Sequence, residues 1–146
     1  MAAIEAQDLT RIYQVGDEEV RALDGLTVSL EKGRLAAVVG PSGSGKSTLM
    51  ALLGGLDTPS SGTVSVYGQK LNGMDPTDLA AYRRSTVGFV FQDFFLLSHL
   101  TAVENVEVPL KLSQIDRQER RQRAVELIKP VGLGHRGDHK PQQLGI

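Results

Sequence analysis

Residues 40–48 read Gly40-Pro41-Ser42-Gly43-Ser44-Gly45-Lys46-Ser47-Thr48. This stretch fits the phosphate-binding loop pattern G-x-x-x-x-G-K-[ST] at every constrained position. Glycines let the backbone adopt conformations that a side chain forbids, so that successive N–H groups point inward at phosphate oxygens. In this pattern Lys46 reaches the β and γ phosphates, and the Ser47 hydroxyl is a ligand of Mg²⁺. The sequence therefore predicts a bound nucleoside triphosphate with Mg²⁺.

The segments on either side of the loop support this prediction. Leu35 to Val39 is a short apolar run with the length of a buried parallel strand, and Ser47 to Leu53 contains no Gly or Pro. A helix that begins at the loop adds free N–H groups and the positive end of its dipole. Val87 to Phe91 is a second apolar run and a candidate neighbour of the first strand. The expected fold is α/β, a P-loop NTPase core with a parallel sheet. The alternative interpretation of residues 40–48 is a plain Gly/Ser turn between a strand and a helix.

The remaining pattern predicts an antiparallel β portion at the N-terminus and helices towards the C-terminus. Strands are expected at Ile4 to Tyr13, Leu26 to Leu30 and Thr63 to Tyr67. Three helix starts have capping signals: Asp75 followed by Pro76, the capping box from Thr101 to Glu104, and Asp116 ahead of a polar helix through Lys129.

Composition limits the classes of function. The chain has 146 residues, 40% of them hydrophobic, and a formal net charge of −1, which argues against a general nucleic-acid binder. No cysteine is present, so no disulfide or thiolate metal site is possible. The N-terminus does not resemble a signal peptide, and no window approaches the ~18 apolar residues of a membrane span. We expect a cytoplasmic chain whose membrane contact is made through a partner.

Two segments carry a family resemblance. Residues 40–62 and Val87-Gly88-Phe89-Val90-Phe91-Gln92 closely resemble the ATP-binding subunits of ABC transporters, and the match runs from about Ile4 to Leu144. Residues 79–84 and 95–106 look like the branch that serves lipoprotein-release and macrolide-export complexes. The resemblance implies ATP and Mg²⁺ as cofactors, a dimer of nucleotide-binding domains, and a place on the inner face of the cell membrane beside a membrane-spanning subunit. It implies export or release of a lipoprotein-like or hydrophobic substrate.

The resemblance also implies roles for single residues. Tyr13 matches the aromatic residue that stacks on adenine, since a ring face offers π contact; without the family it reads as an ordinary strand aromatic. Val20 either lines the same nucleotide face or packs beside the strand. Gln92 matches a glutamine that touches Mg²⁺ or the attacking water, and its amide suits a sensor of the γ-phosphate rather than a base. The expected metal ligands are therefore Ser47 and Gln92.

A run of four apolar residues follows the glutamine: Phe94-Phe95-Leu96-Leu97. Such a run is too apolar for a free surface loop, so it is expected either to be buried or to form a docking patch. In the family this region joins the ATP site to the membrane subunit. The alternative is that these residues pack under the helical subdomain.

The expected organisation is the N-terminal part of a single ABC-type nucleotide-binding domain over residues 1–146. Residues 1–34 and 62–72 would form the antiparallel β portion, and residues 35–61 and 73–92 the phosphate-loop core. Residues 93–146 would form the glutamine loop and the start of a helical subdomain. An incomplete domain of this kind is expected to have poor stability on its own, because an unpaired sheet edge invites aggregation.

Parts of a complete ATPase are missing from the sequence. No run of four apolar residues followed by Asp-Glu occurs after Lys46, and the family's Leu-Ser-Gly-Gly-Gln signature is replaced by Leu144-Gly145-Ile146. We therefore expect a chain truncated at the signature, with no catalytic residue assigned and binding favoured over hydrolysis. A non-catalytic nucleotide- or partner-binding module is the alternative. A small nucleotide kinase is disfavoured by the surroundings of Gln92.

Two further patterns have plain interpretations. His135 and His139 are four residues apart, but Gly137 lies between them and no third ligand is evident, so a metal site is not expected. Four arginines alternate with acids on one predicted helix and indicate a solvated face rather than a nucleic-acid surface. These arginines are Arg117, Arg120, Arg121 and Arg123.

Overall fold

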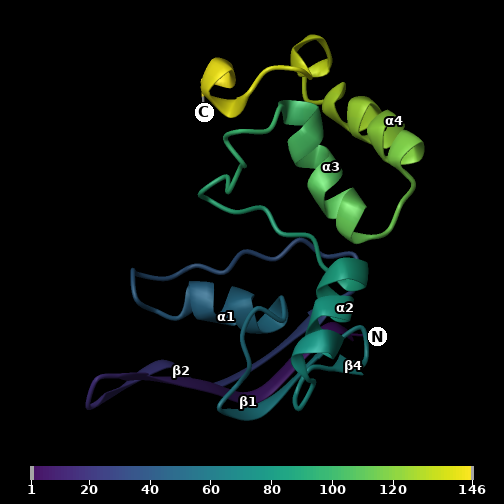
Figure 1. Ribbon diagram of the computed structural model, residues 1–146. Coiled ribbons are helices and arrows are strands. Elements are labelled where there is room, and N and C mark those ends of the chain that lie inside the picture. Colours follow the sequence, from purple (N-terminus) through teal and green to yellow (C-terminus); the bar gives the residue numbers. More distant parts are fainter. Residues whose placement is uncertain (1, 146) are drawn as a thin grey trace. The chain divides into compact units, whose positions relative to one another are not determined.

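The computed structural model describes residues 2–145 (Figure 1). The chain forms two compact units, Met1–Phe89 and Val90–Ile146. The first unit holds all the strands of the described residues, together with two helices. The second unit is helical. The expected three-part organisation of the domain stays a prediction.

An antiparallel sheet forms the base of the first unit. Its strands are β1 (Ala2–Val15), β2 (Glu18–Glu31), β3 (Ser61–Val66) and β4 (Gln69–Lys70), in the order β2-β1-β3-β4. A two-residue turn that contains Gly16 at φ 62° joins β1 to β2, because such tight turns need positive φ. The three strands predicted from alternation are confirmed, and the first two are longer than expected.

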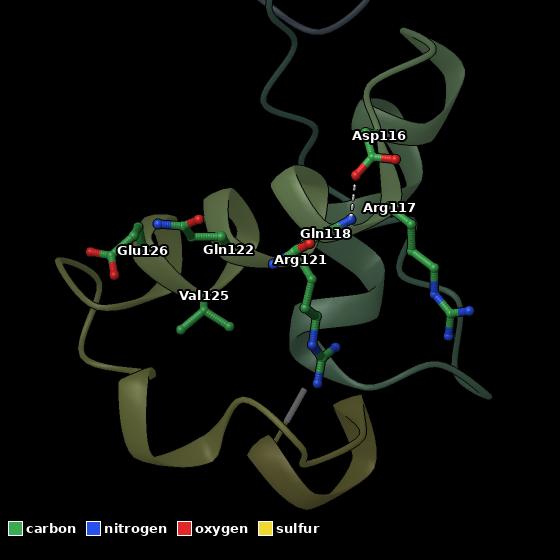
Figure 2. Close-up of a pocket in the computed structure, with 7 residues that line it drawn as sticks. All are labelled: Asp116, Arg117, Gln118, Arg121, Gln122, Val125 and Glu126. Carbon is green, nitrogen blue, oxygen red and sulfur yellow. Dashed lines mark hydrogen bonds between the residues drawn. The ribbon is translucent and has the colours of Figure 1, made fainter.

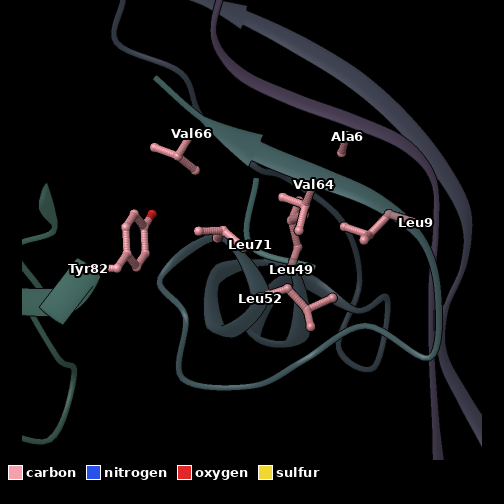
Figure 3. Close-up of a cluster of buried hydrophobic side chains, with 8 residues drawn as sticks. All are labelled: Ala6, Leu9, Leu49, Leu52, Val64, Val66, Leu71 and Tyr82. Atoms are coloured by element: carbon pink, nitrogen blue, oxygen red, sulfur yellow. The ribbon is translucent and has the colours of Figure 1, made fainter. Parts of the chain in front are cut away.

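Two helices pack with this sheet to form the main core. Helix α1 (Lys46–Leu53) and helix α2 (Pro76–Thr86) begin where the sequence predicts, and Asp75 accepts hydrogen bonds from the N–H groups of Thr77 and Asp78. Tyr82 is almost fully buried, and its Oη donates to the Leu53 carbonyl at 2.6 Å. Figure 3 shows the cluster in which α1, α2 and the sheet meet. It contains Ala6, Leu9, Leu49, Leu52, Val64, Val66, Leu71 and Tyr82.

The two parallel strands expected in the core are not present, and these predictions are wrong. Residues 34–40 and 87–91 have no regular secondary structure, and neither segment is one of the strands of the sheet. Leu35 and Val90 are fully exposed. A parallel strand needs hydrogen-bonded neighbours and cover on both faces, and no other strand of the described residues supplies a parallel partner. An apolar run predicts that the segment is buried. It does not predict which strand pairs with that segment.

The second unit is built from a helix pair. Helix α3 (Ala102–Leu112) begins with the predicted capping box, in which Thr101 N–H donates to Glu104 Oε2 at 2.8 Å. Helix α4 (Arg117–Ile128) is capped by Asp116 and packs on α3 through Val103, Ala124 and Ile128. Two short 3₁₀ helices follow, η1 (Gly134–Arg136) and η2 (Pro141–Leu144). Within residues 2–145, no helix has the length and apolar character that a membrane crossing requires.

Candidate nucleotide-binding site

The glycine loop has the backbone geometry that its sequence predicts. Gly43 and Gly45 have φ of +81° and +84°, a region that residues with a side chain avoid. A Cβ atom on Gly45 would lie 2.4 Å from the Ala22 carbonyl oxygen, so the loop is pressed against β2 at this point. Residues 40–44 are exposed. Glycine is therefore required at position 45 for two independent reasons, strain and space.

The first turn of α1 leaves its N–H groups available. Gly45 is the N-cap and provides no side-chain hydrogen bond, and the first turn contains no acidic residue. Among the described residues, the N–H groups of Lys46, Ser47 and Thr48 have no hydrogen-bond acceptor. Most helices satisfy these groups with a capping side chain. An uncapped helix N-terminus without a nearby carboxylate is suited to bind an anion.

Lys46 lies across the same loop. Its ammonium donates to the carbonyl oxygens of Gly40 at 2.9 Å and Pro41 at 2.6 Å, and to Ser44 Oγ at 3.3 Å. The positive charge is therefore held at the mouth of the loop, next to the free N–H groups of α1. Phosphate oxygens would compete with these neutral acceptors for the ammonium. Both partners are charged in an ammonium–phosphate hydrogen bond, so that bond is stronger than one to a neutral carbonyl oxygen.

Tyr13 lies near the hairpin end of β1, in the same compact unit as the loop. Its partner across the β1–β2 ladder is Val20, which is 45% exposed, so the two expected base-contacting residues are neighbours. The Tyr13 hydroxyl donates to Asp57 Oδ2 at 2.7 Å, and the Arg11 guanidinium lies over the ring, 4.6 Å from its centroid. Arg11 also pairs with Asp57 Oδ1 at 2.8 Å.

Asp57 is the common partner of this cluster. Burial alone would raise its pKa, but the hydrogen bonds from Tyr13 and the Thr58 N–H, together with the charge of Arg11, hold the pKa of Asp57 below its ordinary value of 3.8. Sequence reasoning missed Arg11 and Asp57. Asp57 appears in the sequence only as a turn residue, and no spacing rule joins it to a strand 44 residues earlier.

We expect the Asp57→Asn variant to be less stable than the wild type by about 1–2 kcal/mol at neutral pH, because a partly buried ion pair is lost. A carboxylate whose folded-state pKa is lowered contributes its stabilisation above pH 3.8 and loses it as the pH falls through the lowered value. The difference between variant and wild type should therefore shrink below pH 3.8, as measured by urea unfolding across a pH series. Asp24→Asn, in the exposed Arg21–Asp24 pair, is the matched control and should be nearly neutral. A difference that is constant down to low pH would contradict this assignment.

The other predicted site residues belong to the second unit. Gln92 is exposed and lies outside any helix or strand. Phe94, Phe95, Leu96 and Leu97 are also exposed, from 40% for Leu96 to 72% for Phe95. The alternative prediction, that these four residues pack under the helical subdomain, is therefore wrong. The rings of Phe91 and Phe95 meet edge to face, with centroids 5.0 Å apart, so an aromatic contact ties this exposed segment to the residues just before it.

Asn105 on α3 holds the end of this exposed segment. Its Oδ1 accepts from the Leu97 N–H at 2.8 Å, and its Nδ2 donates to the carbonyls of Leu97, Leu100 and Thr101. A single side chain thus replaces the regular backbone partners that the segment lacks. Sequence reasoning missed Asn105, since only the capping box beside it gives a signal.

The Asn105→Ala variant should lose these contacts. We expect a destabilisation of about 1–2 kcal/mol and faster hydrogen exchange at the Leu97 amide, because no acceptor replaces Oδ1. Asn105→Asp is the matched control, since it keeps the acceptor for the Leu97 N–H and removes only the donors. Unchanged exchange at Leu97 in Asn105→Ala would show that the side chain does not order this segment.

A shallow hollow of about 710 Å³ lies along α4 (Figure 2). It is lined by Asp116, Arg117, Gln118, Arg121, Gln122, Val125 and Glu126. Arg121 pairs with Glu107 at 3.1 Å and with Asp138 at 3.3 Å, and Arg123 pairs with Glu119. Acids therefore neutralise much of this basic face, which agrees with its interpretation as a solvated surface. Within residues 2–145, no three His, Cys, Asp or Glu side chains gather as metal ligands.

The chain has a glycine loop and a helix that begins at the lysine of that loop. These two features together are typical of phosphate-loop domains. The family model described as "ABC transporter" matches residues 23–145. The macrolide export ATP-binding/permease protein MacB of Hyphomonas neptunium is 51% identical over 141 residues, 97% of this chain and 22% of the relative. The lipoprotein-releasing system ATP-binding protein LolD of Psychrobacter arcticus is 45% identical over 98% of this chain and 64% of the relative.

Solved structures of ABC cassettes also match this chain. A dimeric ATP-binding cassette in a post-hydrolysis state, bound to ADP and Pi, is 39% identical with a TM-score of 0.87, over 96% of this chain and 62% of the other. A second dimeric bacterial ABC transporter cassette has the same TM-score and coverage at 40% identity. The chain belongs to the ABC transporter family, and its fold matches part of an ABC ATPase domain. It spans about a fifth of the length of the MacB relatives.

Proposed function

We propose that this chain is part of the ATP-binding subunit of an ABC transporter. In this proposal residues 40–48 hold the phosphates of ATP, and Tyr13 stacks on the base. The observation that carries the proposal is the uncapped N-terminus of α1, where free N–H groups and the Lys46 ammonium meet at one exposed glycine loop. An ABC ATPase domain binds nucleotide through such a loop, and the solved relative with bound ADP and Pi supports this assignment.

Mg²⁺ fits the residues present. The ion needs few protein ligands, because it keeps several waters and takes phosphate oxygens from the nucleotide. Ser47 is exposed at the start of α1 and would supply a hydroxyl oxygen. Gln92 stays a metal ligand that the family resemblance alone implies. When bound, the ion neutralises charge on the β and γ phosphates. The residues of this chain bind and orient the nucleotide.

The finer proposal concerns the transporter. The chain would power export or release of a lipoprotein-like or hydrophobic substrate through a membrane-spanning partner, at the inner face of the cell membrane. The names of the MacB and LolD relatives support this branch. Four exposed apolar residues form the proposed contact with the partner, and their exposure supports that role. They are Phe94, Phe95, Leu96 and Leu97. Two such domains would work as a dimer, as in the solved relatives.

A binding and turnover experiment tests the proposal. The 146-residue chain is titrated with ATP and with ADP in the presence of Mg²⁺ by calorimetry, and phosphate release is followed in parallel. We expect saturable binding that Tyr13→Ala weakens. Steady hydrolysis that Lys46→Ala abolishes supports an ATPase, whereas binding without turnover supports the alternative, a non-catalytic nucleotide-binding module. A folded chain that binds neither nucleotide would overturn the proposal.

A further inference from the structure

The ring of Tyr13 is fixed on two sides by residues that no motif includes. One face of the ring is covered by the Arg11 guanidinium, 4.6 Å from the ring centroid. The hydroxyl end is anchored by Asp57 Oδ2 at 2.7 Å. The second oxygen of Asp57 accepts from Arg11 Nη2 at 2.8 Å, so the three side chains form a closed set. A base can therefore stack on only one face of this ring, the face opposite Arg11.

The arrangement is held in a partly water-excluded environment. The side chains of Arg11 and Asp57 are 23% and 21% exposed, so their attraction is less screened than that of a surface pair. The Nε of Arg11 is buried without a hydrogen-bond partner among the described residues. A guanidinium that leaves one donor unsatisfied is held by its other contacts, here the ring face and the carboxylate.

We propose that Asp57 and Arg11 are positioning residues for the nucleotide base: together they fix the Tyr13 ring so that its uncovered face receives the base of ATP. This inference rests on the proposed function, because it takes the Tyr13 ring as the stacking surface. Neither residue is required to touch the nucleotide. Their effect is to immobilise the ring before ATP binds, so that binding does not have to restrict it.

The expected effect is selective. Releasing the ring should weaken ATP binding about three- to tenfold, the size typical of immobilising one side chain on binding. Inorganic tripolyphosphate carries the phosphates without a base, so its affinity should not change. A residue that supported the loop as a whole would instead alter the affinity for both ligands.

The experiment measures ATP and tripolyphosphate binding to the 146-residue chain by calorimetry with Mg²⁺. The variants are Asp57→Ala, Asp57→Asn, Arg11→Gln and Tyr13→Ala, each checked for folding by circular dichroism. Asp24→Ala, in the exposed Arg21–Asp24 pair, is the matched control. We expect Asp57→Ala and Arg11→Gln to weaken ATP binding three- to tenfold with tripolyphosphate unchanged. In the Tyr13→Ala background, Asp57→Ala should have no further effect on ATP.

Other results would overturn the proposal in distinguishable ways. If Tyr13→Ala weakens ATP binding but Asp57→Ala does not, this inference is wrong and the proposed stacking stands. An equal loss for ATP and tripolyphosphate in Asp57→Ala would also overturn it. If Tyr13→Ala changes nothing, the stacking role and this inference are both wrong. Should Asp57→Ala not fold, Asp57→Asn and Arg11→Gln give the same comparison, because each breaks the ion pair while keeping a polar side chain at the position.

Discussion

Lys46→Ala is expected to weaken ATP binding about 10- to 100-fold, since hydrogen bonds from a charged donor contribute about 1.5–3 kcal/mol and each 1.4 kcal/mol is a factor of ten. In the structure the ammonium already lies at the loop mouth, 2.9 Å from the Gly40 oxygen and 2.6 Å from the Pro41 oxygen. It needs only to exchange these acceptors for phosphate oxygens. Calorimetric titration with ATP measures the loss.

Two comparisons make the Lys46 result specific. Tripolyphosphate should lose affinity as strongly as ATP, because the lysine contacts phosphate rather than base. Lys70→Ala, on the exposed edge strand β4, removes the same charge and should leave the affinity unchanged. Equal affinities for wild type and Lys46→Ala would show that the phosphates do not bind at this lysine.

Gly45→Ala should destabilise the first unit by about 2–5 kcal/mol and abolish nucleotide binding at ordinary ATP concentrations. A side chain at φ +84° costs about 1–2 kcal/mol, and its Cβ would lie 2.4 Å from the Ala22 carbonyl oxygen, so the loop must also move away from β2. Movement of the loop displaces the N–H groups at the start of α1. Urea unfolding measures the stability loss, and calorimetry measures the binding.

Gly43→Ala separates the two causes of this effect. Gly43 has a similar φ of +81°, but a Cβ there would meet nothing within 4 Å. We expect it to cost only the strain, about 1–2 kcal/mol. The excess loss in Gly45→Ala is then the cost of the contact with β2. If both variants lost the same stability, the close packing of the loop on β2 would not contribute.

Local signals predicted much of the first unit and of the site. The start of α1 at Lys46, the Asp75 cap and the Thr101–Glu104 capping box follow from residues a few positions apart, and the structure confirms all three. Glycines at positive φ in the loop follow from the phosphate-binding pattern. Such features are predictable because the interactions that fix them lie within one turn or one helix end.

Features that depend on distant partners were not predictable in the same way. The runs from Leu35 and from Val87 are apolar, but whether they form strands depends on neighbours that hydropathy does not name. The Tyr13–Asp57 hydrogen bond joins residues 44 positions apart, and no spacing rule links a strand to a turn over that distance. Asn105 was missed because an asparagine inside a helix has no signal of its own until the segment it holds is seen.

Amide hydrogen exchange on the 146-residue chain, with and without ATP and Mg²⁺, tests directly whether the glycine loop binds the phosphates. In the proposed site, backbone N–H groups from Ser42 to Thr48 bind the phosphates, so these amides should become protected when ATP binds. The protection should persist with tripolyphosphate and be lost in Lys46→Ala. If saturating ATP left the amides of residues 42–48 as exchangeable as before, the phosphates would not bind at this loop.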